Sequence, residues 1–406
     1  MPRLSADPAR MLADLDHLRT IGGVGTGVAR RAFSDADIAA RAWLAGRMRA
    51  AGLEAVVDPC GNLFGLPPGE GPCLLIGSHS DTQPLGGWLD GIWGVAAGLE
   101  LARAALEAGG PRIAVVSFQD EEGRFGRLTG SAVWSGETPL EEADKGAEQD
   151  GDSGETFGTA RRRAAQIAPV AWVGPDRFSA YLEPHIEQGP VLDRADEAVG
   201  VVESIVGLRQ WTLRFEGQTN HAGTTPMPLR RDAVQGFVAY AHALNAAFAP
   251  MVTDRTVWTL GRVVVEPNAS SIVPGVVVVS VQMRDPDAAR LKAMAARALT
   301  LAQEVATARG LALTATEVPG VEPVPMDARL VGALEQAAEA VAPGRWRRMP
   351  SGALHDASNV ARVLPTAMLF APSIGGISHN PAEDTARADL ATALAVLAEA
   401  VGRLTN

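Results

Sequence analysis

Short apolar runs alternate with longer amphipathic segments in the first part of the chain. Apolar residues recur at helical spacing over residues 35–50, and Ser34 is a suitable N-cap for that helix. The runs 72–79 and 112–120 are short and apolar and end in polar clusters, which is typical of buried strands. Between them, residues 92–110 form a helical pattern. This order predicts a parallel or mixed sheet that is covered by helices.

The pattern changes near residue 207, where the predicted elements follow one another in the order βαββαβ. The six segments are 208–217, 232–248, 256–267, 276–285, 287–310 and 311–318. This order is that of a ferredoxin-like sandwich. We therefore predict an α/β fold with a mixed-sheet catalytic domain, residues 1–206 and 321–406, that is interrupted by an inserted ferredoxin-like domain, residues 207–320.

Composition narrows the class of protein. The 406 residues are 47% hydrophobic and 20% charged, as in ordinary globular proteins. A net charge of −11 disfavours a nucleic-acid partner. Because the sequence has neither a signal-peptide core nor the ~20 continuous apolar residues that span a bilayer, we expect a cytoplasmic protein without a membrane partner. Cys60 and Cys73 are expected to be buried thiols, and the glycine-rich run 21–27 lacks the spacing of a nucleotide-binding loop.

The histidines separate into two kinds. His17 and His242 fall on helix patterns and are expected at the surface or in the core. The other five lie in dense polar motifs: His79, His185, His221, His355 and His379.

Carboxylates accompany these histidines at the predicted strand ends. Asp90 lies in GGWLDG, and the adjacent Glu121 and Glu122 lie in QDEEG. Because sites gather at the carboxyl ends of strands in such sheets, we expect these groups to share one edge, where buried charges require a cation. A pair of metal ions needs about three protein ligands per ion and one bridging group, and Asp90 is the candidate for the bridge.

The remaining acids are expected beside the metals. Asp81 is too close to His79 along the strand to share its face, so we expect it to fix the His79 tautomer through the other ring nitrogen. Adjacent glutamates at a strand end point to opposite sides, so that one of Glu121 and Glu122 can bind metal while the other acts as a general base. The residues alone thus predict a metal-dependent hydrolase.

The motifs resemble those of the M20-type metallopeptidase clan, and within it the hydantoinase/carbamoylase branch of N-carbamoyl-L-amino acid hydrolases, β-ureidopropionases and allantoate amidohydrolases. The resemblance runs nearly end to end, and HIEQGP and NHAGTTPM are specific to this branch. Other matching motifs are GSHSDT, GGWLDGIWGV, QDEEGRFG, SGALHDA and APSIGGISHNPAE.

The resemblance implies two divalent metal ions per subunit. His79, Asp90 and His185 would hold one ion, and Asp90, Glu122 and His379 would hold the other. Ligands of this mixed kind suit Zn, Mn, Co or Ni.

The resemblance also implies roles around the metals. Glu121 would be the general base that activates the attacking water. The inserted domain would act as a lid and as the dimerisation surface of a homodimer, and His221 of one subunit would stabilise the oxyanion in the partner's site. Arg284 would bind a substrate carboxylate with two hydrogen bonds, and Gln188 would line the pocket.

Three positions depart from the family pattern on the side of the substrate. Leu208, Ser271 and Leu354 stand where family members often have Gln, Asn and Gly. Asn268 is the candidate to replace the lost amide, and the two leucines predict a narrower or more apolar pocket. Compensation by neighbouring residues, with no change of substrate, is the alternative.

The expected reaction is hydrolysis of the ureido C–N bond of an N-carbamoyl amino acid or a related ureido acid, which gives an amino acid, carbon dioxide and ammonia. The alternative is an ordinary N-acyl amino acid or dipeptide amide cut at the same di-metal site, and His185 in place of an acidic ligand favours the ureido substrate by resemblance. A catalytically inactive binding protein is disfavoured, because a binder has no use for the free carboxylate of Glu121.

Overall fold

The computed structural model describes residues 4–149 and 154–405, which form two compact units. The first unit joins the chain up to Glu203 with the chain from Pro325 onward, and the second is Ser204–Val324. The expected inserted domain, residues 207–320, lies within the second unit. Among the described residues, there is no helix whose length and apolar character would suffice to cross a bilayer.

The first unit is built on one large mixed sheet. Over the described residues its strands pair in the order β15-β8-β17-β7-β5-β6-β4-β3, with β16 beside β8. Their bounds are β3 Glu54–Val57, β4 Leu63–Leu66, β5 Cys73–His79, β6 Ile113–Phe118, β7 Phe178–Ile186, β8 Val199–Ile205, β15 Val324–Pro325, β16 Trp346–Ser351 and β17 Thr366–Ala371. The neighbours β17, β7, β5 and β6 run parallel, whereas β8 and β4 flank them antiparallel. The predicted mixed α/β fold is confirmed.

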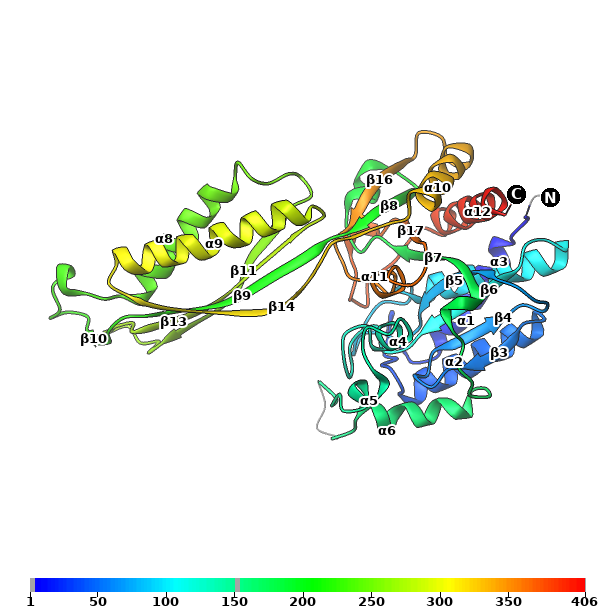
Figure 1. Ribbon diagram of the computed structural model, residues 1–406, viewed down its shortest axis with the longest axis horizontal. Coiled ribbons are helices and arrows are strands. Elements are labelled where there is room, and N and C mark those ends of the chain that lie inside the picture. Colours follow the sequence, from blue (N-terminus) through cyan, green and yellow to red (C-terminus); the bar gives the residue numbers. More distant parts are fainter. Residues whose placement is uncertain (1–3, 150–153, 406) are drawn as a thin grey trace. The chain divides into compact units, whose positions relative to one another are not determined.

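Helices cover this sheet (Figure 1). The α-helices of the first unit are α1 Pro8–Thr20, α2 Asp35–Ala50, α3 Ile92–Ala108, α4 Thr129–Trp134, α5 Leu140–Ala143, α6 Phe157–Ala160, α7 Val191–Ala195, α10 Ala328–Val341, α11 Ala357–Val360 and α12 Arg387–Leu404. Short 3-10 turns are η1 Arg161–Gln166, η2 Pro175–Arg177 and η4 Ile374–Gly376. Helix α3 packs across β5, β6 and β7, and it is buried from Ile92 to Ala105, which explains why its sequence is apolar on every side.

Two local predictions concern the N-terminal part of this unit. Helix α2 begins where expected, and the Ser34 hydroxyl accepts a hydrogen bond from the amide of Asp37 at 3.2 Å. The glycine-rich run folds into a hairpin of β1 Gly23–Val24 and β2 Gly27–Val28. Val28 exchanges two backbone hydrogen bonds with Gly86, so that the hairpin is fastened to the segment that leads to Asp90.

The second unit is a four-stranded antiparallel sheet with strand order β11-β13-β9-β14. Its elements are β9 Gly207–Glu216, β10 Asn220–His221, η3 Met227–Leu229, α8 Ala233–Phe248, β11 Val257–Glu266, β12 Ile272–Val273, β13 Val276–Asp285, α9 Ala288–Ala308 and β14 Ala312–Val321. Burial alternates along β13, and Val277, Val279 and Val281 share one core with Phe215 and both helices. Figure 1 shows α8 and α9 side by side over the sheet.

Candidate metal centre

Four parallel strands deliver most of the candidate ligands to one edge of the first unit's sheet. His79 is the last residue of β5, and His185 is the penultimate residue of β7. Glu122 follows the end of β6, and His379 follows the end of β17. Asp90 joins them from the turn before α3. Because parallel neighbours end at the same edge, residues more than a hundred positions apart in the sequence can converge there.

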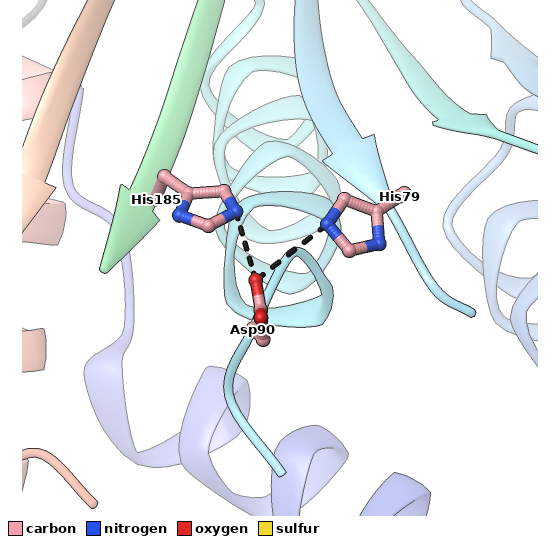
Figure 2. Close-up of side chains that lie close together, drawn as sticks. All are labelled: His79, Asp90 and His185. Carbon is pink, nitrogen blue, oxygen red and sulfur yellow. Dashed lines mark ion pairs between the residues drawn. The ribbon is translucent and has the colours of Figure 1, made fainter. Parts of the chain in front are cut away.

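The first group of donors is formed by His79, Asp90 and His185, all buried (Figure 2). Asp90 Oδ1 lies 3.1 Å from His185 Nε2 and 3.6 Å from His79 Nε2. The Nδ1 atoms face backbone carbonyls instead, at 3.0 Å from Asp81 in His79 and 2.9 Å from Ile186 in His185. A carbonyl can only accept a hydrogen bond, so each Nδ1 carries a proton, and each Nε2 turned toward Asp90 is available as a ligand atom.

This group has the geometry of a cation site. His185 Nε2 is buried and has no hydrogen-bond partner among the described residues, although Asp90 Oδ1 is close. His185 Nε2 and Asp90 Oδ1 are close but are not aligned as a hydrogen-bond donor and acceptor. If the imidazole is neutral with its proton on Nδ1, the lone pair of Nε2 therefore faces a carboxylate oxygen. A tetrahedral ion with bonds of about 2.1 Å places its ligand atoms about 3.4 Å apart. The separations of 3.1 and 3.6 Å from Asp90 Oδ1 fit that requirement.

The second group of donors is formed by Asp90, Glu122 and His379. His379 Nε2 lies 3.3 Å from Asp90 Oδ2 and 3.6 Å from Glu122 Oε2. The two oxygens of Asp90 thus face different histidines, as a bridging carboxylate requires. The His379 side chain is 50% exposed, so this group opens to solvent while the first group is closed.

The pKa values of these groups indicate a local demand for positive charge. Burial would raise the pKa of Asp90, but the three imidazoles around it outweigh burial and hold that pKa well below its usual value. Burial would lower the pKa of His79, but Glu121 and neighbouring aspartates hold it well above its usual value. Burial and the charge of Asp90 raise the pKa of Glu122 to about 7. Crowded carboxylates of this kind are stabilised by a bound cation.

The adjacent glutamates reach the site differently from the expectation. Strand β6 ends at Phe118, and Asp120 has a left-handed backbone with φ 57°, so strand alternation does not extend to them. The Asp81 carboxylate accepts their backbone amides, at 3.4 Å from Glu121 and 3.2 Å from Glu122. Glu121 Oε2 nevertheless lies 3.6 Å from His79 Nε2, whereas Glu122 faces His379. The loop thereby separates the two side chains, and Glu121 belongs to neither donor group.

Asp81 holds His79 through its backbone and not through its carboxylate. The His79 ring nitrogen bonds to the Asp81 carbonyl, while the nearer carboxylate oxygen is 3.6 Å away. The carboxylate instead fixes the glutamate loop, because its two oxygens accept one amide each.

Gln188 belongs to the same cluster. Its Nε2 lies 3.0 Å from Asp90 Oδ2, 3.2 Å from Ser378 Oγ and 3.2 Å from His379 Nε2. Of the other candidates in the first unit, Leu354 is half-buried, and it precedes the buried His355. The His355 ring stands edge-on to His185, with centroids 4.4 Å apart, and burial holds its pKa well below the usual value. His355 is therefore a neutral neighbour of a candidate ligand.

The remaining candidates belong to the second unit and lie at two ends of its sheet. His221 pairs with Ile272, next to the exposed Ser271, and Asn268 lies in the same turn region. Arg284 lies opposite Leu208, eight residues along β13 from its start at Val276. Eight residues of strand span about 26 Å, so these two groups of candidates are far apart within one chain.

Two polar side chains at the ligands escaped the sequence-based reasoning. Gln83 Nε2 donates to Glu122 Oε2 at 2.6 Å. Glu383, four residues after His379, is buried and accepts the amides of Leu89 and Asp90. Their only signal was proximity in sequence to a ligand motif, within SHSDTQP and HNPAE.

The chain is similar to known proteins over nearly its whole length. The model of "Peptidase family M20/M25/M40" matches residues 75–403. An N-carbamoyl-L-amino-acid amidohydrolase of Rhizobium meliloti is 36% identical, over 98% of this chain and 96% of the relative. The allantoate amidohydrolase of Escherichia coli is 37% identical, over 87% of each chain. The crystal structure of an amidase (hydantoinase/carbamoylase family) from Burkholderia phymatum has a TM-score of 0.93 and 43% identity, and the match covers 100% of this chain and 99% of that one.

Proposed function

We propose a function from one premise: the chain belongs to peptidase family M20/M25/M40. It is an amidohydrolase that cleaves the ureido C–N bond of an N-carbamoyl amino acid or a related ureido acid. One water is consumed, and the products are the free amino acid, carbon dioxide and ammonia. The observation that carries the proposal is the arrangement of Asp90, whose two oxygens face two groups of donors while Glu121 stands beside them in neither group. The names of the relatives support the choice of a ureido substrate.

Two divalent ions would complete the centre. His79, Asp90 and His185 would hold one, and Asp90, Glu122 and His379 would hold the other. When bound, such ions polarise the carbonyl under attack and make water acidic enough to react near neutral pH. Zn, Mn, Co and Ni all suit this set of nitrogen and oxygen donors.

The protein's own groups supply proton transfer and orientation. Glu121 would take a proton from the attacking water and return it to the departing nitrogen. Burial, with neighbouring carboxylates adding to it against the opposing effect of His79, raises the pKa of Glu121 well above the usual value. The Gln188 amide now donates to Asp90 Oδ2. With a cation bound to that oxygen, the Gln188 amide would be free to point toward the substrate.

The second unit would serve as a ferredoxin-like lid and as the dimerisation surface of a homodimer. His221 Nδ1 accepts the amides of Gly223 and Thr224 at 3.0 and 3.1 Å, so the neutral ring carries its proton on Nε2. Nε2 is thus a fixed donor suited to an oxyanion. His221 pairs with Ile272 in the small β10–β12 sheet, just before β13 begins at Val276, whereas Arg284 lies eight residues further along β13. Eight residues of strand span about 26 Å, which is too far for one small substrate to reach both ends. If both contact the substrate, they come from different subunits.

Specificity would come from side chains around the expected substrate. Arg284 would bind its carboxylate with two hydrogen bonds, and Asn268 and Ser271 would contribute polar contacts at the other end of the sheet. Leu354, beside His355, would narrow the pocket. Location in the cytoplasm stays a prediction from the sequence.

The test is ammonia release by protein loaded with Mn²⁺ or Zn²⁺. The panel contains N-carbamoyl-L-amino acids, N-carbamoyl-β-alanine and allantoate, with N-acetyl amino acids as controls. Ammonia from a ureido compound, abolished by a chelator and restored by metal, is the expected result. Cleavage of the N-acetyl controls without any ureido turnover would replace the proposed substrate by an ordinary amide and leave the metal centre in place.

A further inference from the structure

The carboxylate of Glu383 lies between two segments that carry candidate ligands. Its residue is 2% exposed. Oε1 accepts the backbone amides of Leu89 and Asp90, each at 3.1 Å, and Oε2 accepts the hydroxyl of Ser378 at 2.9 Å. One side chain therefore holds both the backbone of the bridging aspartate and the residue before His379, although these segments are almost 300 positions apart in the sequence.

The segment before Asp90 is shaped around this carboxylate. At Gly87, an added β-carbon would lie 2.0 Å from Glu383 Oε1, a separation that no pair of non-bonded atoms tolerates. A glycine at this position therefore lets the backbone close on the carboxylate, and both amides beyond it can point at one oxygen.

His379 needs support of this kind. Its side chain is 50% exposed, and its backbone has φ 53°, a region that disfavours residues with a β-carbon. The Ser378 hydroxyl donates to Glu383 and accepts from Gln188 Nε2 at 3.2 Å, so it is held from both sides. Fixing Ser378 in this way limits the freedom of the adjacent ligand.

We propose that Glu383 is a positioning residue for the second metal ion, because it sets the spacing between Asp90 and His379. The inference rests on the two-ion centre proposed above. Glu383 does not bind metal in this scheme; it acts through the two segments it joins. Residues that orient metal ligands in this way typically change metal affinity by about 10- to 100-fold when they are removed.

Three variants of the full chain test the proposal. Glu383→Ala removes all three hydrogen bonds. Glu383→Gln retains the two bonds from the amides through its carbonyl oxygen. It replaces the third by a bond of opposite direction, in which its NH₂ group donates to Ser378 Oγ. Thr385→Val is the matched control, because Thr385 lies two residues after Glu383. The change removes a buried hydrogen bond of 2.7 Å from the Thr385 hydroxyl to the Pro372 carbonyl, and it touches neither ligand segment.

Each protein is stripped with a chelator and titrated with Mn²⁺, and electron paramagnetic resonance separates isolated ions from a coupled pair about 3.5–4 Å apart. We expect two ions and a coupled signal in the parent, Glu383→Gln and Thr385→Val. In Glu383→Ala we expect the second ion to bind about 10- to 100-fold more weakly, with an isolated-ion signal at equal metal. Melting of the stripped proteins measures any general loss of stability.

The outcomes separate this inference from the proposed function. A parent protein that binds fewer than two ions would overturn the two-ion centre and the inference with it. A parent with two ions and a Glu383→Ala protein that binds both with unchanged affinity would overturn the role of Glu383 alone. Equal losses in Glu383→Ala and Glu383→Gln, or in Thr385→Val, would also refute it, because the hydrogen bonds to the two segments would then not be the cause.

Discussion

Replacement of Glu121 by glutamine isolates proton transfer from metal binding. Glutamine has nearly the same volume as glutamate, so the packing at this partly buried position is kept, but its amide cannot accept a proton from water. Glu121 belongs to neither of the two donor groups, whose atoms lie within 4.8 Å of one another. The metal content of Glu121→Gln should therefore equal that of the parent.

The expected loss of activity follows from the role of a general base. Such groups contribute about 10²- to 10⁴-fold to the rate, or about 3–5 kcal/mol of transition-state stabilisation. We expect kcat for ammonia release to fall within that range, with little change in KM, because the lost interaction forms in the transition state. The assay is steady-state ammonia release on the preferred ureido substrate, with metal content measured on the same sample by mass spectrometry.

Glu122→Gln is the matched control, because Glu122 Oε2 faces His379 Nε2 at 3.6 Å. This variant should lose metal together with activity, whereas Glu121→Gln should lose activity alone. Full activity of a metal-loaded Glu121→Gln protein would refute the assignment of the base. Loss of metal from Glu121→Gln would show that the two glutamates are not divided between base and ligand.

Three further perturbations test separate parts of the molecule. Mixing His221→Ala with Glu121→Gln should restore part of the activity through hybrid dimers, whereas no recovery after verified subunit exchange would place His221 in its own subunit's site. Chelation should lower the melting temperature, since a ligand at 100 times its dissociation constant adds about 2.7 kcal/mol of stability, and an unchanged melting temperature would contradict structural coupling of the metals. Phe215→Ala should cost about 3–5 kcal/mol, because Phe215 is fully buried in the core of the second unit. Limited proteolysis should then cut within 204–324 while metal content is retained, and simultaneous loss of both would show that the units fold together.

The hydrophobic pattern predicted the strands and helices whose burial in the fold matches the apolar residues of their own sequence. The runs that became β5 and β6 are buried on both faces, so they are apolar without interruption and easy to recognise. Helix α3 is apolar on every side for the same reason. Because parallel strands end together, the pattern also predicts that His79 and the glutamates share one edge of the sheet.

Other features depend on contacts that no local pattern records. No local pattern indicates the left-handed backbone of Asp120, so the strand predicted to reach the glutamate pair ends at Phe118 instead. Glu383 was missed because its partners, Leu89 and Asp90, are almost 300 residues away in the sequence. A carboxylate that accepts backbone amides places no demand on the type of the residues that donate them. Only the nearby Gly87 is restricted, because an added β-carbon there would meet the Glu383 carboxylate.

The candidate metal ligands and most of the positions expected to choose the substrate lie in different units of the chain. All the candidate metal ligands lie in the first unit. Of the three positions expected to depart from the family pattern, Leu208 and Ser271 lie in the second unit, whereas Leu354 lies in the first. Leu208 is 6% exposed and pairs with Arg284 across β9 and β13, so an apolar side chain stands beside the guanidinium expected to bind the substrate carboxylate. An apolar neighbour strengthens each charge-assisted hydrogen bond but offers no polar group of its own. We therefore expect a substitution at Leu208 to change which ureido acid is accepted without changing the candidate metal ligands.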